Sequence, residues 1–354
     1  MSDIKITARK YHSTSQFREV IRAVTDRTRY LGRNEQGEVM YDPVKELPTI
    51  QYQGTVKVHG TNGSLVKYAD GRIYRQSKER ILDITHDNIG FFEAMYTVPV
   101  EVLFEQVEAI FVAKTGKEVK YPIEIAGEWA GKGIQKGVAV SEVPKFFMII
   151  GVNVGMDNAE EEGYGWQSLA DYVTVEMPEK RIFNAMRFGF WTTNINFNRP
   201  ADVQNTLVEL TTAIEADCPV GKALGATECT IGEGIVWVPV DQNLAKHTGL
   251  WFKVKGEKHS VSKVKTLAAV DPEKMASIDA FVEYAVTENR MNQGIQEVGL
   301  DIKKTGEYLG WLNRDIFKEE ADVLAASELT MKDVGSAVSN KARKYYMLKL
   351  QEGL

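Results

Sequence analysis

A single lysine, Lys57, lies in a glycine-rich stretch, QYQGTVKVHGTNGSLV, over residues 51–66. A lysine amine attacks a phosphorus or carbonyl centre only in its neutral form, and at an ordinary pKa of about 10.4 very little of it is neutral at pH 7. Lowering the pKa to about 8, by burial or by neighbouring cations, would raise the neutral fraction about two-hundredfold. The stretch therefore predicts either a nucleophilic lysine with other cations nearby or an ordinary strand lysine before a turn.

Two cations that could act on such a lysine are Lys253 and Lys255, in the stretch WFKVK. They are two positions apart in a strand pattern, so both ammonium groups point to one face and the apolar residues beside them point to the other. The pair could contact the α-phosphate of a nucleotide, offset the charge of departing pyrophosphate and lower the pKa of Lys57. An exposed strand edge that carries lysines against aggregation would give the same pattern.

Two glutamates occupy otherwise apolar strands, Glu128 in IAGEWAG and Glu233 in GEGIVWVP. Burying a carboxylate without a partner is costly, so each is expected to bind a ribose hydroxyl, a cation or a metal, unless it faces water on a half-exposed sheet. Glycines on both sides of each glutamate would let a ligand approach the backbone. A further basic stretch, RQSKER, places Arg75 and Lys78 at the end of the hairpin that begins with Lys57.

The elements that must position these residues have an α+β pattern. Alternation of apolar and polar residues predicts strands over 50–59 and 64–68, joined to a returning strand, RIYRQS, by a turn at Asp70-Gly71. Further strands are predicted in YPIEIAGEW, KFFMIIGVNV, EGIVWVPV and LWFKVK. Apolar residues at helical spacing predict a helix over 100–111.

After about residue 265 the pattern becomes helical. Asp271-Pro272 predicts a helix start, an apolar stripe follows over 275–285, and Thr330 to Asp333 resembles a capping box that opens a last helix. We therefore predict two domains, a β-rich domain over 1–262 and a helical domain over 263–354.

The composition fits a soluble globular protein with room for two domains: 354 residues, 44% hydrophobic and 26% charged. No apolar run approaches the length of a membrane span, and no signal-like apolar stretch follows the first residues. A net charge of −6 argues against a basic coat over the whole protein, but not against a local basic groove. Cys218 and Cys229 indicate neither a disulfide framework nor a metal site, as expected in a reducing cytoplasm.

In chain order the motifs are K-x-x-G, S-K, G-E-x-x-G, an aromatic-led apolar strand, E-G-I-V and K-V-K. This set resembles that of the covalent nucleotidyltransferase superfamily of ATP-dependent ligases and capping enzymes. His59, where DNA ligases and capping enzymes usually carry aspartate, is similar to the RNA ligases of the phage nick-sealing and RNA-editing branch, and so is the helical tail. The resemblance implies an α+β fold, with an antiparallel-sheet nucleotidyltransferase domain followed by a small all-helical RNA-binding domain.

The resemblance also implies catalytic roles for four residues. Lys57 would become linked to AMP. Glu233 would hold a metal ion. Lys253 and Lys255 would contact phosphates.

Nucleotide-binding roles are implied for a wider set, which adds His59, Gly60, Asn62, Lys78, Glu128, Phe146 and Phe147 to those four. Glu128 would hold the ribose hydroxyls, and either Phe146 or Phe147 would stack on adenine. Lys78 stands where this branch usually has arginine, and it lacks the planar fork with which arginine binds phosphate. Thr55-Val56 precede Lys57 where relatives often have Arg-Glu.

The sequence therefore predicts an ATP-dependent RNA ligase that uses Mg²⁺, or Mn²⁺ in its place. It would join 3′-hydroxyl and 5′-phosphate RNA ends in RNA repair, with nicked duplexes favoured, in the cytoplasm, or in the host cytoplasm if the protein is phage-encoded. The alternatives are a DNA ligase or an mRNA-capping guanylyltransferase of the same superfamily, and a non-catalytic RNA-binding or virion protein that has kept the fold. No membrane partner is expected, and no oligomeric state is predicted.

Overall fold

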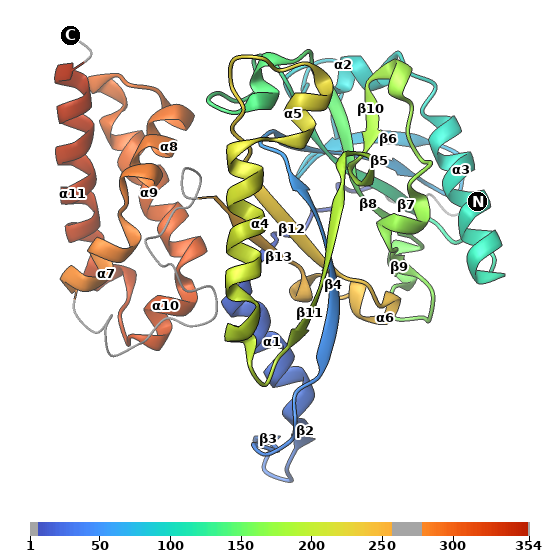
Figure 1. Cartoon of the computed structure of the whole chain (residues 1–354), viewed down its shortest axis with the longest axis horizontal. Coiled ribbons are helices and arrows are strands. Elements are labelled where there is room, and N and C mark those ends of the chain that lie inside the picture. Colours follow the sequence, from blue (N-terminus) through green and yellow to red (C-terminus); the bar gives the residue numbers. More distant parts are fainter. Residues whose placement is uncertain (1–5, 257–277, 353–354) are drawn as a thin grey trace.

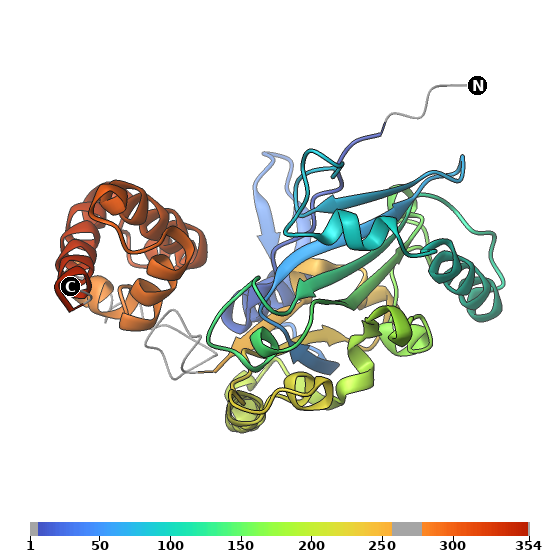
Figure 2. The same ribbon diagram turned by 90° about the horizontal axis from the view of Figure 1, so that it is seen from above.

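The computed structural model describes residues 6–256 and 278–352. Two sheets with covering helices form the part up to residue 256, and helices form the part after residue 278 (Figure 1). Seen from above, these helices gather in a bundle beside the sheets (Figure 2). The α+β class and the helical C-terminal region are thus confirmed, whereas the predicted boundary between residues 262 and 263 lies outside the described residues.

The first sheet has the strand order β1-β13-β12-β4-β11 and is antiparallel except for the β1–β13 pair. Its strands are β1 (Ser15–Gln16), β13 (Phe252–Lys255), β12 (Gly234–Pro239), β4 (Thr49–Lys57) and β11 (Phe190–Asn196). Every second residue of β4 from Ile50 to Val56 is buried, which confirms the alternation predicted there. Helix α1 (Phe17–Arg29) packs on β13, and helix α4 (Gln204–Ala216) packs on β12 and β13.

The second sheet has the order β10-β8-β7-β5-β6, with β9 paired to β8, and only the β8–β10 pair is parallel. Its strands are β5 (Thr61–Lys67), β6 (Ile73–Ser77), β7 (Ile123–Ala130), β8 (Phe146–Val154), β9 (Gly165–Trp166) and β10 (Ile182–Asn184). A second hydrophobic core joins this sheet to α2 (Phe91–Tyr96) and α3 (Glu101–Thr115). Helix α3 confirms the helix predicted over 100–111, and it ends at Gly116, whose φ of +65° favours glycine.

Three smaller features complete this part of the chain. Ahead of β4, the strands β2 (Tyr30–Arg33) and β3 (Val39–Tyr41) form a hairpin that projects from the body (Figure 1). Two short helices, α5 (Pro219–Leu224) and α6 (Gln242–Ala245), flank β12 in the chain.

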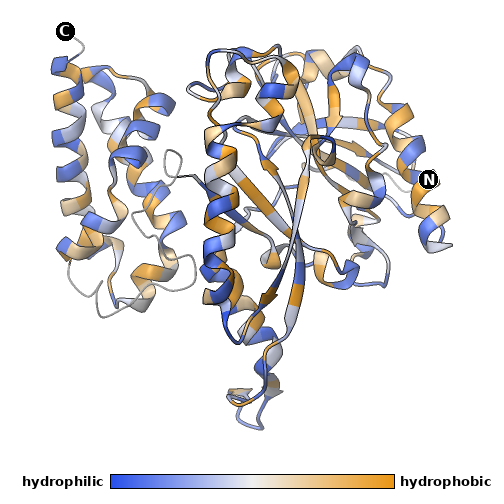
Figure 3. Ribbon diagram, viewed as in Figure 1, coloured by the Kyte–Doolittle hydropathy of each residue, from blue (hydrophilic) through white to orange (hydrophobic). Residues whose placement is uncertain are grey.

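The helical region comprises α7 (Ile278–Ala285), α8 (Glu288–Val298), α9 (Thr305–Glu319), α10 (Ala321–Ala326) and α11 (Met331–Glu352). These helices carry both hydrophobic and hydrophilic residues (Figure 3), because each buries one face in a common core. The backbone N–H of Thr330 donates to the Asp333 carboxylate, which is one of the two hydrogen bonds of a capping box. The Thr330 hydroxyl also donates to this carboxylate, and the Asp333 N–H donates to the Thr330 carbonyl oxygen at 3.0 Å. The helix start predicted at 271–272 lies outside the described residues.

Buried ion pairs connect the helical region to the first sheet. Arg18 of α1 lies 2.9 Å from Glu320, which is fully buried. Arg290 of α8 binds the other oxygen of Glu320 at 2.9 Å, and Lys253 of β13 lies 3.1 Å from Glu319 at the end of α9. The helical region thus reaches a strand that carries predicted site residues. No helix among residues 6–256 and 278–352 combines the length and apolar character that crossing a membrane would need.

Candidate active site

Strand pairing brings two of the predicted lysines to one glutamate. Gly234, the first residue of β12, is the register partner both of Lys57 on β4 and of Lys255 on β13. Glu233, one residue earlier, accepts a hydrogen bond from Lys57 Nζ at 2.6 Å through Oε2, and its Oε1 lies 3.3 Å from Lys255 Nζ. Gly234 has φ +153°, and a Cβ there would lie 2.1 Å from the carbonyl oxygen of Val254, so this pairing requires glycine.

The three charges shift one another's pKa. Burial alone would raise the pKa of Glu233, but Lys57 and Lys255 outweigh it and hold that pKa below its ordinary value. Burial acts to lower the pKa of Lys57, yet the carboxylates of Glu233 and Glu128 prevail and raise it. The pKa of Lys255 is lowered, because burial and the nearby Lys57 together outweigh Glu233.

The prediction that neighbouring cations lower the pKa of Lys57 is therefore wrong for the ligand-free protein. Lys255 is near, as predicted, but Glu233 lies between the two lysines and contacts Lys57 directly. Lys253 is paired with Glu319. For Lys57 to act as a nucleophile, another positive charge must offset the carboxylate of Glu233 during the reaction, so that Lys57 can lose its proton.

Glu128 is held beside this group by pairing between β5 and β7, where it is the register partner of Asn62. Its carboxyl group accepts a hydrogen bond from the Gly60 backbone N–H at 3.0 Å, and the Asn62 amide donates to the Gly127 carbonyl at 3.2 Å. Burial raises the pKa of Glu128 to about 7, although Lys57 opposes the shift. Near neutral pH the carboxyl group can therefore either donate to or accept from a hydroxyl group.

A cavity of about 390 Å³ lies between the two sheets, and we call it the larger cavity. The predicted residues that line it are Lys57, Gly60, Asn62, Lys78, Glu128 and Lys253. Its apolar walls come from both sheets and include Met148, Ile150, Val236 and Val238. An apolar cavity of this size with a few convergent charged groups suits a small molecule such as a nucleotide.

The sequence did not predict that residues 11–14 also line the larger cavity. The ring of His12 packs edge-on against Trp166 and Trp251, and burial, with a smaller effect of Lys78, lowers its pKa to about 4. His12 is therefore neutral at physiological pH. Lys78 donates to the Ser13 hydroxyl at 3.2 Å, which fixes its amine at the cavity wall. This segment shows neither periodicity nor a motif, so the sequence carried no signal for it.

Phe146 and Phe147 are both fully buried and do not line either of the two cavities described here. Phe147 packs on Phe91 in the second core, and Phe146 belongs to a different hydrophobic core, which includes Ile50 and Trp237 of the first sheet. The residues of β8 that face the larger cavity are Met148 and Ile150. The placement therefore gives no support to the predicted stacking of one phenylalanine on adenine. The larger cavity meets β8 at Met148 and Ile150, beyond the two phenylalanines along the strand.

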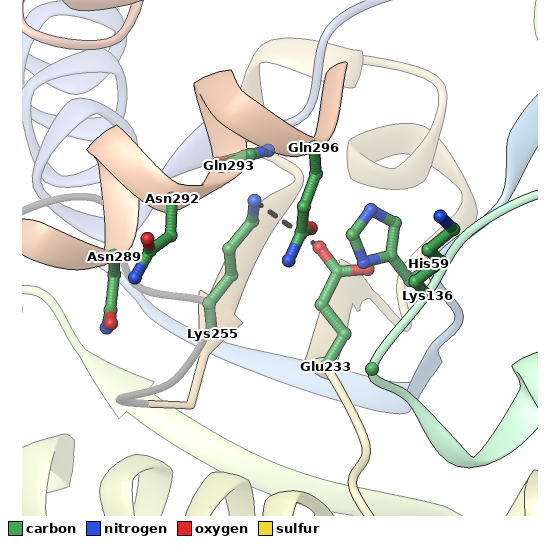
Figure 4. Close-up of a pocket in the computed structure, with 9 residues that line it drawn as sticks. His59, Lys136, Glu233, Lys255, Asn289, Asn292, Gln293 and Gln296 are labelled. Carbon is green, nitrogen blue, oxygen red and sulfur yellow. Dashed lines mark ion pairs between the residues drawn. The ribbon is translucent and has the colours of Figure 1, made fainter. Parts of the chain in front are cut away.

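A second cavity of about 170 Å³, the smaller cavity, lies on the Lys255 side of Glu233 (Figure 4). His59, Lys136, Glu233 and Lys255 line it from the part of the chain up to residue 256. Burial is the main cause that lowers the pKa of His59, so its ring is uncharged at neutral pH. The other wall consists of side-chain amides on α8, from Asn289, Asn292, Gln293 and Gln296. None of these amides belongs to a motif predicted from the sequence.

The described residues contain no group of three or more His, Cys, Asp or Glu side chains that could enclose a metal ion. Glu233 lines the smaller cavity and Glu128 the larger. Magnesium ions commonly bind through one or two carboxylates together with substrate phosphates and water. The donor set present therefore fits a divalent cation that binds together with a nucleotide.

Comparison with known proteins gives a likeness in structure only, since no known sequence family and no curated protein matches the chain. Naegleria gruberi RNA ligase with pyrophosphate superposes with a TM-score of 0.41 at 13% identity, over 70% of this chain and 56% of the ligase. A variant of that ligase with ATP and Mn gives 0.42 at 12% identity, over 71% and 56%. The present chain thus spans little more than half of the ligase. Because these TM-scores lie below 0.5, the likeness assigns no activity, and function is inferred from the site itself.

Proposed function

We propose that this chain is an ATP-dependent RNA ligase that forms a lysyl-AMP intermediate at Lys57. The observation that carries the proposal is the position of the Lys57 amine. It lines a cavity of nucleotide size and contacts a carboxylate that a second lysine shares. Glu128 lines the same cavity and suits the ribose hydroxyls. The motif order of the sequence supports the same reaction.

In the first step, the neutral Nζ of Lys57 attacks the α-phosphorus of ATP. A nitrogen–phosphorus bond forms, the bond from that phosphorus to the bridging oxygen breaks, and pyrophosphate leaves with the electron pair. The proton of the amine passes to water. Glu233 orients the amine by their 2.6 Å hydrogen bond, and Lys255 offers positive charge to the phosphates. A divalent cation bound at Glu233 would supply further positive charge and offset the carboxylate that raises the pKa of Lys57.

Two further steps complete the reaction. An oxygen of the 5′-phosphate of an RNA end attacks the phosphorus of lysyl-AMP, the nitrogen–phosphorus bond breaks, and Lys57 recovers its proton. The 3′-hydroxyl of the other RNA end then attacks the activated 5′-phosphate, loses its proton, and AMP leaves. Lys78 and Lys253, which line the larger cavity beside Lys57, would bind phosphate groups in these steps.

We propose RNA with 3′-hydroxyl and 5′-phosphate ends as the substrate, with nicks in a duplex preferred, and the helical region as a contact for it in the cytoplasm. Support comes from His59 in the first motif and from the contact of the helical region with β13. Phosphate contacts by lysines would make binding weaken as salt rises.

The test is covalent labelling. The protein is incubated with labelled ATP and Mg²⁺, and gain of one AMP at Lys57 is measured by mass spectrometry. Lys57→Ala is expected to remain unlabelled. Absence of the adduct in the wild type would refute the proposal, and labelling by GTP alone would indicate a capping enzyme. Sealing of nicked duplex RNA is then compared with joining of free single strands, and faster nick sealing is expected.

A further inference from the structure

The wall that helix α8 gives to the smaller cavity has a uniform chemistry. Asn289, Asn292, Gln293 and Gln296 are spaced by three, four and seven residues, so their side chains share one face of the helix. The opposite face is buried in the core of the helical region through residues such as Met291 and Val298. Because the other face of α8 is buried in the bundle, the amide face points towards His59, Glu233 and Lys255 across the smaller cavity.

Glu233 separates the smaller cavity from the nucleotide site. One of its oxygens contacts Lys57, which lines the larger cavity, and the other faces Lys255, which lines the smaller. In Figure 4 the Gln296 side chain extends from α8 towards the Lys255–Glu233 ion pair, and Gln293 projects from the same helix. The smaller cavity is therefore linked to Lys57 through the shared contacts of Glu233.

The size and lining of the smaller cavity point to a phosphate group. Its volume of about 170 Å³ is below the range of about 300–1,000 Å³ typical of sites for whole small molecules. Lys136 and Lys255 bring positive charge, and each glutamine amide can donate two hydrogen bonds. Within the described residues, Gln293 and Gln296 have no side-chain hydrogen bond, so these donors remain available to a ligand. Phosphate oxygens accept such bonds.

We propose that Gln293 and Gln296 of α8, with Lys136 and Lys255, form a binding site for a phosphate group on the Lys255 side of Glu233. This inference rests on the proposed ligase function, because that reaction supplies two phosphate groups that could occupy the site. One source is the pyrophosphate released from ATP, and the other is the 5′-phosphate of an RNA end. Either phosphate group has to bind near the Lys57–Glu233 pair, and Lys255, which contacts the same carboxylate, lines the smaller cavity.

The test measures binding to the full chain with Mg²⁺ present, by calorimetry. The probes are inorganic pyrophosphate, a nicked RNA duplex with a 5′-phosphate at the nick, and the same duplex with a 5′-hydroxyl. The variant is Gln293→Ala/Gln296→Ala, and Glu297→Ala, exposed on the same helix outside the cavity lining, is the control. Gln293→Glu/Gln296→Glu keeps the shape and replaces the amide donors by carboxylates.

We expect both double variants to weaken phosphate binding at least about tenfold, the effect of losing one or two hydrogen bonds to a charged group, with Glu297→Ala unchanged. If the double variants bind only pyrophosphate more weakly, the site holds the phosphate derived from ATP. If instead they no longer prefer the nick with a 5′-phosphate over the nick with a 5′-hydroxyl, the site holds the RNA end. No binding of either probe by the wild type, or equal binding by the double variants and the control, would overturn the site. Failure of Lys57 to gain AMP, with pyrophosphate binding intact, would instead remove the ligase function and leave this site standing.

Discussion

Lys57 and Lys255 offer a direct test of the electrostatics of the site. Their side chains are similarly exposed, at 22% and 19%, and both contact Glu233. The pKa of Lys57 is nevertheless raised, and that of Lys255 is lowered. Since only the neutral amine reacts with an acylating reagent, we expect Lys255 to be modified faster than Lys57 at every pH from 7 to 9.

The magnitude follows from the titration of an amine. While the pH stays below the pKa, the neutral fraction rises about tenfold per pH unit, so an amine with a pKa above 10 gains about a hundredfold between pH 7 and 9. A lysine with a pKa of about 8 would gain only about tenfold and would begin to level off. The structure therefore predicts a log-linear rise for Lys57 across this range.

The assay uses limiting acetylation of the ligand-free protein and quantifies each modified peptide by mass spectrometry. Glu233→Gln keeps the shape of the carboxylate and removes its charge. We expect both lysines to react faster in this variant, Lys57 by the larger factor, because its contact with Glu233 is 2.6 Å against 3.3 Å for Lys255. The account would be refuted if the acetylation rate of Lys57 in the wild type levelled off below pH 9, or if Glu233→Gln left that rate unchanged.

Three further predictions concern the surroundings of the site. Arg290→Met leaves Glu320 buried without one of its two arginine partners and should reduce the free energy of unfolding by about 3 kcal/mol in urea titrations, and no loss would contradict the role of the pair. Glu319→Gln should lower the KM for ATP in single-turnover labelling, because it frees Lys253 for phosphate, and a higher KM would count against this. The pKa of Glu128 is raised from 4.5 to about 7 in the folded protein, so the folded state holds this proton more tightly than the unfolded state does. The free energy of unfolding should therefore be highest below pH 4.5 and fall by about 3 kcal/mol by pH 7. Glu128→Gln, which does not titrate, should remove this fall in unfolding titrations at pH 4.5 and pH 7.

Local pattern was sufficient to predict the strands that carry the site. The alternation in β4 and β13 follows from one face being buried, and Lys253 and Lys255 share the half-buried face while Phe252 and Val254 are buried. Motif order also indicated that Lys57, Glu233 and Lys255 belong to one site, and strand register brings them together.

The sequence could not predict features that depend on contacts between distant segments. The sign of the Lys57 pKa shift depends on which of Glu233 and Lys255 lies nearer, and that is set by three strands in register. Which part of β8 meets the larger cavity also depends on sheet packing. Phe147 points to the other face of the strand, and Phe146 lies on the face of Met148 but before the point where the cavity meets the strand. Strand β8, which is largely buried on both faces, carries no alternation that could have shown this.

The helical region also bears on how a nucleotide would bind. In the ligand-free protein, Lys57 and Lys255 share Glu233, and Lys253 pairs with Glu319 from α9. A phosphate that takes Lys253 must displace Glu319, and so it weakens a contact between the helical region and the first sheet. Coupling between two binding events is reciprocal, so whatever draws the helical region away from β13 strengthens phosphate binding at Lys253 by the same free energy. Release of Glu319 from Lys253 and binding of the nucleotide phosphate to Lys253 are therefore linked equilibria.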